Sequence, residues 1–152
     1  MINISWDHSE DHEFFQHLLS TNEFPLASWL NLFDFDDPSM KRAAFNRIRN
    51  EVHRGLLSQH GNTCHLQLVD KCADAGEHVD HIIPISTNVL NKLRGLRPEP
   101  GKKVLTQSLG SNHTDNLVLA CAACNNHKKH RIMDRSTTLR LLEISSGREL
   151  TT

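Results

Sequence analysis

Four cysteines place the strongest constraint on how this chain can fold. Cys121 and Cys124 form a CxxC motif, whereas Cys64 and Cys72 stand far earlier in the chain and are separated by seven residues. A CxxC turn presents two thiolates to one ion, and two cysteine pairs complete a tetrahedral Zn²⁺ site. The spacing of the first pair is the less specific half of this pattern. If all four bind one ion, residues 64–72 must lie against residues 121–124.

Two disulfide bonds, or scattered buried thiols, are the alternative interpretations of the same cysteines. The sequence contains neither a signal peptide nor an apolar membrane span. We therefore expect a cytoplasmic protein without membrane contact, in which reducing conditions favour zinc over disulfides. Because sulfur would fill all four positions around the ion, this zinc is expected to stabilise the fold and to take no part in catalysis.

Polar residues with specific chemistry lie in two segments, Glu77-His-Val-Asp80-His81-Ile-Ile-Pro84 and Asn116-Leu-Val-Leu-Ala-Cys121-Ala-Ala-Cys124-Asn125-Asn-His-Lys128-Lys129. Adjacent side chains of a strand point to opposite faces, so Asp80 and His81 cannot share one role. Asp80 suits a hard divalent cation, which takes oxygen ligands and often only one or two from protein, and the Asn125 side-chain oxygen can supply a second. His81, with an ordinary pKa of about 6.5, suits a general base that removes a proton from water.

These residues and their order resemble the HNH nuclease family, whose ββα-metal unit hydrolyses nucleic-acid phosphodiesters. The resemblance covers roughly residues 62–131. It implies that His81 is the general base, that Asn116 orients this base, and that Asn125 replaces the histidine usual at the third signature position. It also implies DNA cleavage that leaves 3′-hydroxyl and 5′-phosphate ends. An oxygen-rich site favours Mg²⁺ or Mn²⁺ over Zn²⁺ as the catalytic ion.

The expected fold class is α+β, with a small ββα-metal nuclease core and a structural zinc site, flanked by N-terminal helices and a short C-terminal helix. We divide the chain into a helical N-terminal extension, residues 1–61, and an HNH nuclease domain, residues 62–152. A small catalytic unit buries too little apolar surface to hold its shape without a metal or additional helices.

Capping residues and apolar periodicity predict helices over about 9–19, 24–35, 38–60, 122–131 and 138–146, and a strand over 117–120. The helix over 38–60 has the clearest limits, because Asp37 and Pro38 match an N-cap followed by proline and Gly61 matches a C-terminal stop. Its expected apolar side consists of Ala44, Phe45, Ile48, Val52 and Leu56.

The formal net charge of −1 conceals an uneven distribution. Residues 1–37 contain eight acidic residues and no Lys or Arg, whereas residues 38–152 carry 17 basic and 10 acidic ones, a formal +7. A positive domain attracts a polyanion and gains affinity by counterion release. We therefore expect duplex DNA as the partner. The acidic segment is expected either to restrain DNA binding or to dock a second copy of the chain or a regulatory protein.

Basic side chains in three segments are candidates for phosphate contact. The helix over 38–60 has a basic side, for which a simple solvated face is an equally good interpretation. The long connection over residues 86–113 is a candidate substrate clamp, or a loop without a role. The predicted nucleic-acid-binding residues are Arg42, Arg49, Lys102, Lys103, Lys128, Lys129 and Arg131, with Lys128 at the basic position usual in the family.

Two classes of function follow from the sequence. The first is a metal-dependent HNH endonuclease, in which His81 activates water and a divalent cation stabilises the phosphate. The second is a zinc-stabilised module that has lost catalysis and only binds nucleic acid or protein. The presence of Asp80, His81, Asn116 and Asn125 together favours the nuclease, because a degenerate module has no reason to keep all four.

Overall fold

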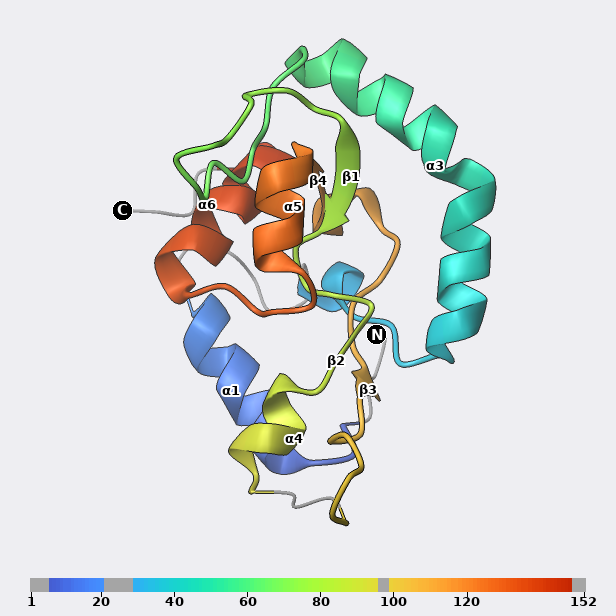
Figure 1. Cartoon of the computed structure of the whole chain (residues 1–152), viewed down its shortest axis with the longest axis vertical. Helices are drawn as coiled ribbons and strands as arrows, with labels where there is room; N and C mark the ends of the chain where they lie inside the picture. The colour runs from blue at the N-terminus through green and yellow to red at the C-terminus, as the bar shows by residue number, and fades with distance from the viewer. Residues whose placement is uncertain (1–5, 21–28, 96–98, 149–152) are drawn as a thin grey trace.

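The computed structural model describes residues 6–20, 29–95 and 99–148. The α-helices in these ranges are α1 (Ser9–Leu19), α3 (Pro38–His60), α4 (Val89–Leu93), α5 (Ala122–Lys128) and α6 (Arg135–Ser146) (Figure 1). The strands are β1 (His78–His81), β2 (Ser86–Thr87), β3 (Gln107–Ser108) and β4 (Leu117–Ala120), and 3-10 helices cover Leu30–Leu32 and Thr114–Asn116. The predicted α+β class is confirmed. Much of the predicted helix over 24–35 lies outside the described residues.

Strands β1 and β4 form an antiparallel pair in which Asp80 lies opposite Val118 and His81 opposite Leu117. Helix α5 follows β4 and also contacts β1. Strands β2 and β3 form a second antiparallel pair. The connection over 86–113 is therefore not one long loop, because it contains α4 and this two-stranded ribbon.

Helix α3 starts and ends where the sequence predicts. The Asp37 carboxylate accepts the backbone N–H of Ser39 at 2.8 Å, and Gly61 ends the helix with a φ of 81°. A φ of this sign is accessible to glycine at little cost because glycine has no Cβ. Helix α1 and strand β4 also have their predicted limits. Helix α5 ends at Lys128, three residues early, because Lys129 has a φ of 50°.

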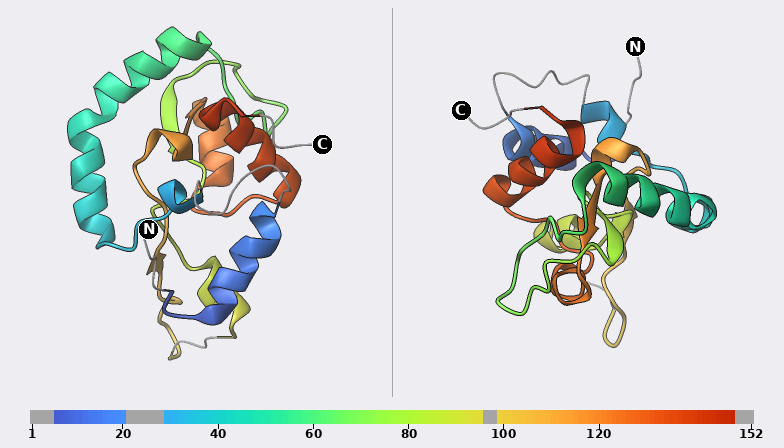
Figure 2. Two further views of the ribbon diagram at one scale, coloured as in Figure 1. Left: turned by 180° about the vertical axis from the view of Figure 1, so that it is seen from behind. Right: turned by 90° about the horizontal axis from the view of Figure 1, so that it is seen from above.

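The buried side of α3 differs from the predicted one. Phe45 and Leu56 are buried as expected, but Ala44 and Ile48 are exposed and the Lys41 side chain is buried instead. Figures 1 and 2 show the reason: α3 runs along one outer side of the molecule, and α1 and α6 lie together on the opposite side. Because the main contacts of α3 with helices and strands are those with β1 and β4, one narrow stripe of the helix is enough to cover them.

One hydrophobic cluster joins the N-terminal segment to the rest of the chain. Phe15 and Leu19 of α1 belong to the same buried cluster as Leu66 and Ile82. One turn before Phe15, on the same side of α1, the buried Asp11 carboxylate forms an ion pair with Arg94. The described part of the 1–61 extension is thus packed as part of the common core. In the described part of the chain, no helix is long and apolar enough to cross a membrane.

Gly110 lies at a close approach of two segments. Its N–H donates to the carbonyl of Pro84 at 2.8 Å, and a Cβ at this position would lie 1.9 Å from the carbonyl oxygen of Ile83. Gly110→Ala is expected to destabilise the protein by about 3 kcal/mol, because the backbone must move to relieve the overlap. Urea denaturation measures the loss. The matched control is Gly55→Ala in α3, where a Cβ meets nothing within 4 Å and helix propensity predicts a gain of up to about 1 kcal/mol. Equal stabilities of the two variants would contradict this account.

Candidate functional site

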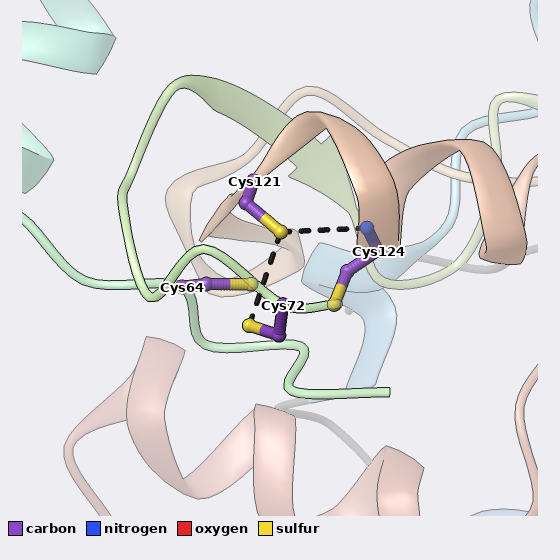
Figure 3. Close-up of side chains that lie close together, drawn as sticks. All are labelled: Cys64, Cys72, Cys121 and Cys124. Atoms are coloured by element: carbon purple, nitrogen blue, oxygen red, sulfur yellow. Dashed lines mark hydrogen bonds between the residues drawn. The ribbon is translucent and has the colours of Figure 1, made fainter. Parts of the chain in front are cut away.

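The four cysteines come together as the sequence predicts. Their sulfur atoms all lie within 4.8 Å of one another, and Figure 3 shows them converging from two loop positions and from the start of α5. The Sγ atoms of Cys72 and Cys121 are 3.8 Å apart, well beyond the length of a disulfide bond, and all four thiols are free. Such a group of sulfur ligands could hold a zinc ion.

Backbone N–H groups point at these sulfur atoms. Leu68 N–H donates to Cys124 Sγ at 3.2 Å, and Cys124 N–H donates to Cys121 Sγ at 3.4 Å. Burial raises the pKa of the Cys121 thiol, but the backbone N–H groups of Cys124 and Ala73 outweigh it and lower the pKa to about 7. The surroundings of this thiol therefore favour the thiolate that binds a metal. A zinc ion held here would fix the start of α5 against the loop that follows α3.

The predicted general base His81 and the two predicted metal ligands, Asp80 and Asn125, line one pocket of about 330 Å³. Strand β1 contributes Asp80 and His81, and α5 contributes Asn125. As strand geometry requires, the two adjacent side chains of β1 have different neighbours. Asp80 contacts Lys128 of α5. The His81 ring packs edge-on against Phe45 of α3, with 4.7 Å between the ring centroids. Both still reach the pocket because they lie at the end of the strand.

Asn112 fixes the orientation of the His81 ring. His81 Nε2 lies 2.9 Å from Asn112 Oδ1, and Asn112 Nδ2 donates to the carbonyl of Lys41 at 2.9 Å. A carbonyl can only accept, so the amide nitrogen must face Lys41 and the amide oxygen must face His81. Nε2 of His81 therefore carries the hydrogen, and Nδ1 keeps its lone pair.

Burial lowers the pKa of His81 to about 4. The Asn112 hydrogen bond raises this pKa, whereas the positive charges of Lys128, Lys41 and Arg42 lower it further. The imidazole is therefore neutral at neutral pH. A neutral ring with a free Nδ1 has the form that a general base requires.

Asp80 is paired with a buried lysine. Its Oδ2 atom lies 3.0 Å from Lys128 Nζ and forms an ion pair without a well-aligned hydrogen bond. Lys128 Nζ also donates to the backbone carbonyl of His81 at 2.8 Å. Burial raises the pKa of Asp80, and Lys128 opposes this shift. Oδ2 has no hydrogen-bond partner among the described residues. The Asp80 side chain also lines the pocket, where a cation could use its carboxylate together with the Asn125 amide oxygen.

The structure corrects the role expected of Lys128. Its side chain is fully buried, so it cannot meet a phosphate at the surface in this structure. The physical reason is the burial of Asp80, because a carboxylate removed from water needs a positive partner. The residue predicted to bind DNA instead neutralises a candidate metal ligand.

Asn116, expected to orient His81, bonds to the backbone beside it. Its side chain is fully buried, where Oδ1 accepts the N–H of Ile83 at 2.8 Å and Nδ2 donates to the carbonyls of Ile83 and Ser111 at 2.9 Å. These bonds tie the end of β1 to the start of β4. Asn116 thus shapes the backbone that carries His81, while Asn112 holds the His81 ring. Sequence reasoning missed Asn112, which lies in an irregular loop 31 residues from His81 and has no periodic signal.

The remaining predicted DNA-binding residues divide into three groups. Arg42 and Lys129 line the pocket. Arg49 is exposed on α3, and Arg131 donates to the carbonyls of His127 and Lys128 at the end of α5. Lys102 and Lys103 are exposed on the α4–β3 connection, which extends away from β1 and α5 (Figure 1). Their expected clamp role has no support from this placement.

Comparison of the chain with protein families, with curated proteins and with solved structures gave no significant match.

Proposed function

We propose that this protein is a metal-dependent endonuclease of the ββα-metal kind, which hydrolyses phosphodiester bonds in DNA. The observation that carries the proposal is the meeting of Asp80, His81 and Asn125 at one pocket, where no described residue uses the Nδ1 lone pair of His81. The order β1, β4, α5 supports the proposal, because two antiparallel strands followed by a helix match the expected nuclease unit.

His81 activates the attacking water in this proposal. Nδ1 accepts the proton, while Asn112 keeps the hydrogen of Nε2 on the opposite side of the ring. Phe45 packs against the ring and restricts its rotation. A positioned general base contributes roughly 10² to 10⁴ in rate.

Asp80 and Asn125 would hold Mg²⁺ or Mn²⁺. Their oxygen donors suit a hard cation, and both side chains line the pocket. When bound, the ion supplies positive charge that polarises the phosphate and stabilises the leaving oxygen. Lys128, whose Nζ lies 3.0 Å from Asp80 Oδ2, balances the charge of the buried carboxylate. Zinc at the four cysteines has a structural role only.

DNA is the proposed substrate because the side chains around the pocket are basic. Arg42, Lys129 and His130 surround the single carboxylate, Asp80. This arrangement suits the approach of a phosphodiester, which carries one negative charge and needs positive neighbours.

A substrate panel tests the proposal. The zinc-loaded protein is incubated with supercoiled plasmid, linear duplex, single-stranded DNA and RNA in Mg²⁺, Mn²⁺ or EDTA. We expect cleavage of DNA that requires Mg²⁺ or Mn²⁺ and stops in EDTA, with zinc content measured afterwards to exclude loss of the structural ion. Binding of DNA without cleavage under all conditions would instead identify an inactive binding module.

Asn112→Ala is expected to lower kcat by about 10-fold to 100-fold, with little change in KM. This loss is smaller than that from removing His81, because the variant keeps the general base and loses only the side chain that positions it. Asn112→Asp should shift the pH–rate profile to higher pH, because a carboxylate beside His81 raises the pKa of its ring. The matched control is Asn126→Ala, which alters an exposed residue of the same pocket. Wild-type kcat and an unchanged pH profile in both Asn112 variants would remove this residue from the mechanism.

A further inference from the structure

A second pocket, of about 410 Å³, adjoins the candidate catalytic pocket. The two pockets share Arg42 and His130. The remaining lining comes from the start of α3 and from the β2–β3 region, namely Pro38, Ser39, Ser86, Thr87, Asn88 and Thr106. The shared residues make the two pockets parts of one groove.

The chemistry of the second pocket suits an anion. Hydroxyl and amide side chains dominate its lining, which contains Arg42 and no carboxylate. Arg42 Nη2 donates to Ser86 Oγ at 2.7 Å, which directs the guanidinium toward the boundary of the two pockets. The nearby Asp37 carboxylate is occupied by the backbone N–H groups of Ser39 and Met40. A phosphate would therefore meet hydrogen-bond donors and one fixed positive charge.

We propose that the second pocket binds the phosphate next to the scissile one on the same strand, with Arg42 between them; this subsite rests on the proposed nuclease function. A nucleic-acid strand carries one phosphate per about 3.4 Å of helix axis. Two adjoining pockets that share an arginine match two successive phosphates better than two separate ligands. The subsite makes the substrate a polynucleotide strand and places it along the start of α3.

Dinucleotides provide a direct test because each contains one phosphodiester bond. A dinucleoside monophosphate is compared with the same molecule carrying an added phosphate at its 5′ end or at its 3′ end. Each competes against a fluorescent DNA oligonucleotide for zinc-loaded His81→Ala protein in Mg²⁺, so that the oligonucleotide is not cleaved, and binding is measured by anisotropy. We expect about tenfold tighter binding with the added phosphate at one end only, because the subsite lies on one side of the catalytic pocket.

Variants separate the subsite from general attraction between charges. In Ser86→Ala/Asn88→Ala the advantage of the added phosphate should fall to about twofold or less, whereas Ser58→Ala, on the exposed side of α3, should keep it. The subsite would be overturned if the 5′ and the 3′ phosphate raised affinity equally and the double variant kept both gains. This holds even if metal-dependent DNA cleavage is observed. The other outcome is a gain in affinity from the phosphate at one end, which the double variant abolishes, in a protein that never cleaves DNA. That result would retain the subsite and overturn the proposed catalytic function.

Discussion

His81→Ala is expected to lower kcat for DNA cleavage by roughly 10² to 10⁴ while zinc content and DNA affinity stay at wild-type levels. Asn112 holds the neutral ring through Nε2, and no described residue uses the Nδ1 lone pair. His81 lines one pocket with Asp80 and Asn125. Alanine removes the only imidazole that the described structure places on β1 at this pocket, and it deletes no buried charge. Initial rates of plasmid cleavage in Mg²⁺ measure the change.

The control for this variant is His78→Ala, since His78 is an exposed histidine of the same strand. It should cleave at the wild-type rate. A His81→Ala protein that is folded by circular dichroism and cleaves as fast as wild type would exclude His81 as the base. Equal losses in both variants would point to damage to β1 rather than to lost proton transfer.

Cys121→Ser is expected to cause the largest loss of stability. The sulfur lies in the four-cysteine cluster and also caps the start of α5 by accepting the Cys124 N–H. Loss of one ligand should release the zinc, and folding loses the free energy that metal binding supplies. A loss of about 5 kcal/mol corresponds to a fall in Tm of about 10 to 20 °C for a chain of this length. Thermal unfolding and elemental analysis measure the two effects together.

Asn125→Ala separates the two metals and is the matched comparison for Cys121→Ser. Asn125 follows the cysteine pair in α5 but lines the catalytic pocket, so the variant should keep its zinc and its Tm and lose Mg²⁺-dependent cleavage. Replacement of Asp80 is less suitable because it would leave the buried Lys128 without its counter-ion. Protein purified without chelator that contains no zinc would contradict the structural-site interpretation.

Local signals in the sequence predicted several elements correctly. The limits of α3 follow from Asp37, Pro38 and Gly61, whose effects act within a few residues. Strand β4 covers the predicted residues 117–120, because a short apolar run ahead of the CxxC motif is buried on all sides. The cysteine cluster was predictable as well, since four thiols of the right spacing have few other uses in a reducing environment.

Positions that depend on tertiary contacts were not predictable in the same way. Lys41 and Lys128 are charged, and such residues are almost always exposed unless they are paired. Lys41 is buried because its ammonium donates to the carbonyls of Asp34, Ile85 and Gly110. Those partners meet only after the chain has folded. The same holds for Asn112, whose contacts lie 31 and 71 residues away in sequence.

The acidic segment, residues 1–37, stays predicted either to restrain DNA binding or to dock a partner. Truncation is a poor test of this prediction. Phe15 and Leu19 are part of the common core, so deletion of residues 1–37 would expose apolar surface. Substitution of exposed acids such as Glu10 and Glu13 by glutamine leaves this packing intact. Tighter DNA binding by that variant would support a restraining role.

We propose that the pocket formed by Asp80, His81 and Asn125 is a metal-dependent phosphodiesterase site. The most direct measurement is the rate of relaxation of supercoiled plasmid by zinc-loaded wild-type protein, with Mn²⁺ and with EDTA, beside His81→Ala at equal concentration. We expect relaxation by the wild type in Mn²⁺, none in EDTA, and a rate at least 10²-fold lower for His81→Ala. Relaxation at equal rates by both proteins, or no relaxation by a wild-type protein that binds the plasmid, would contradict it.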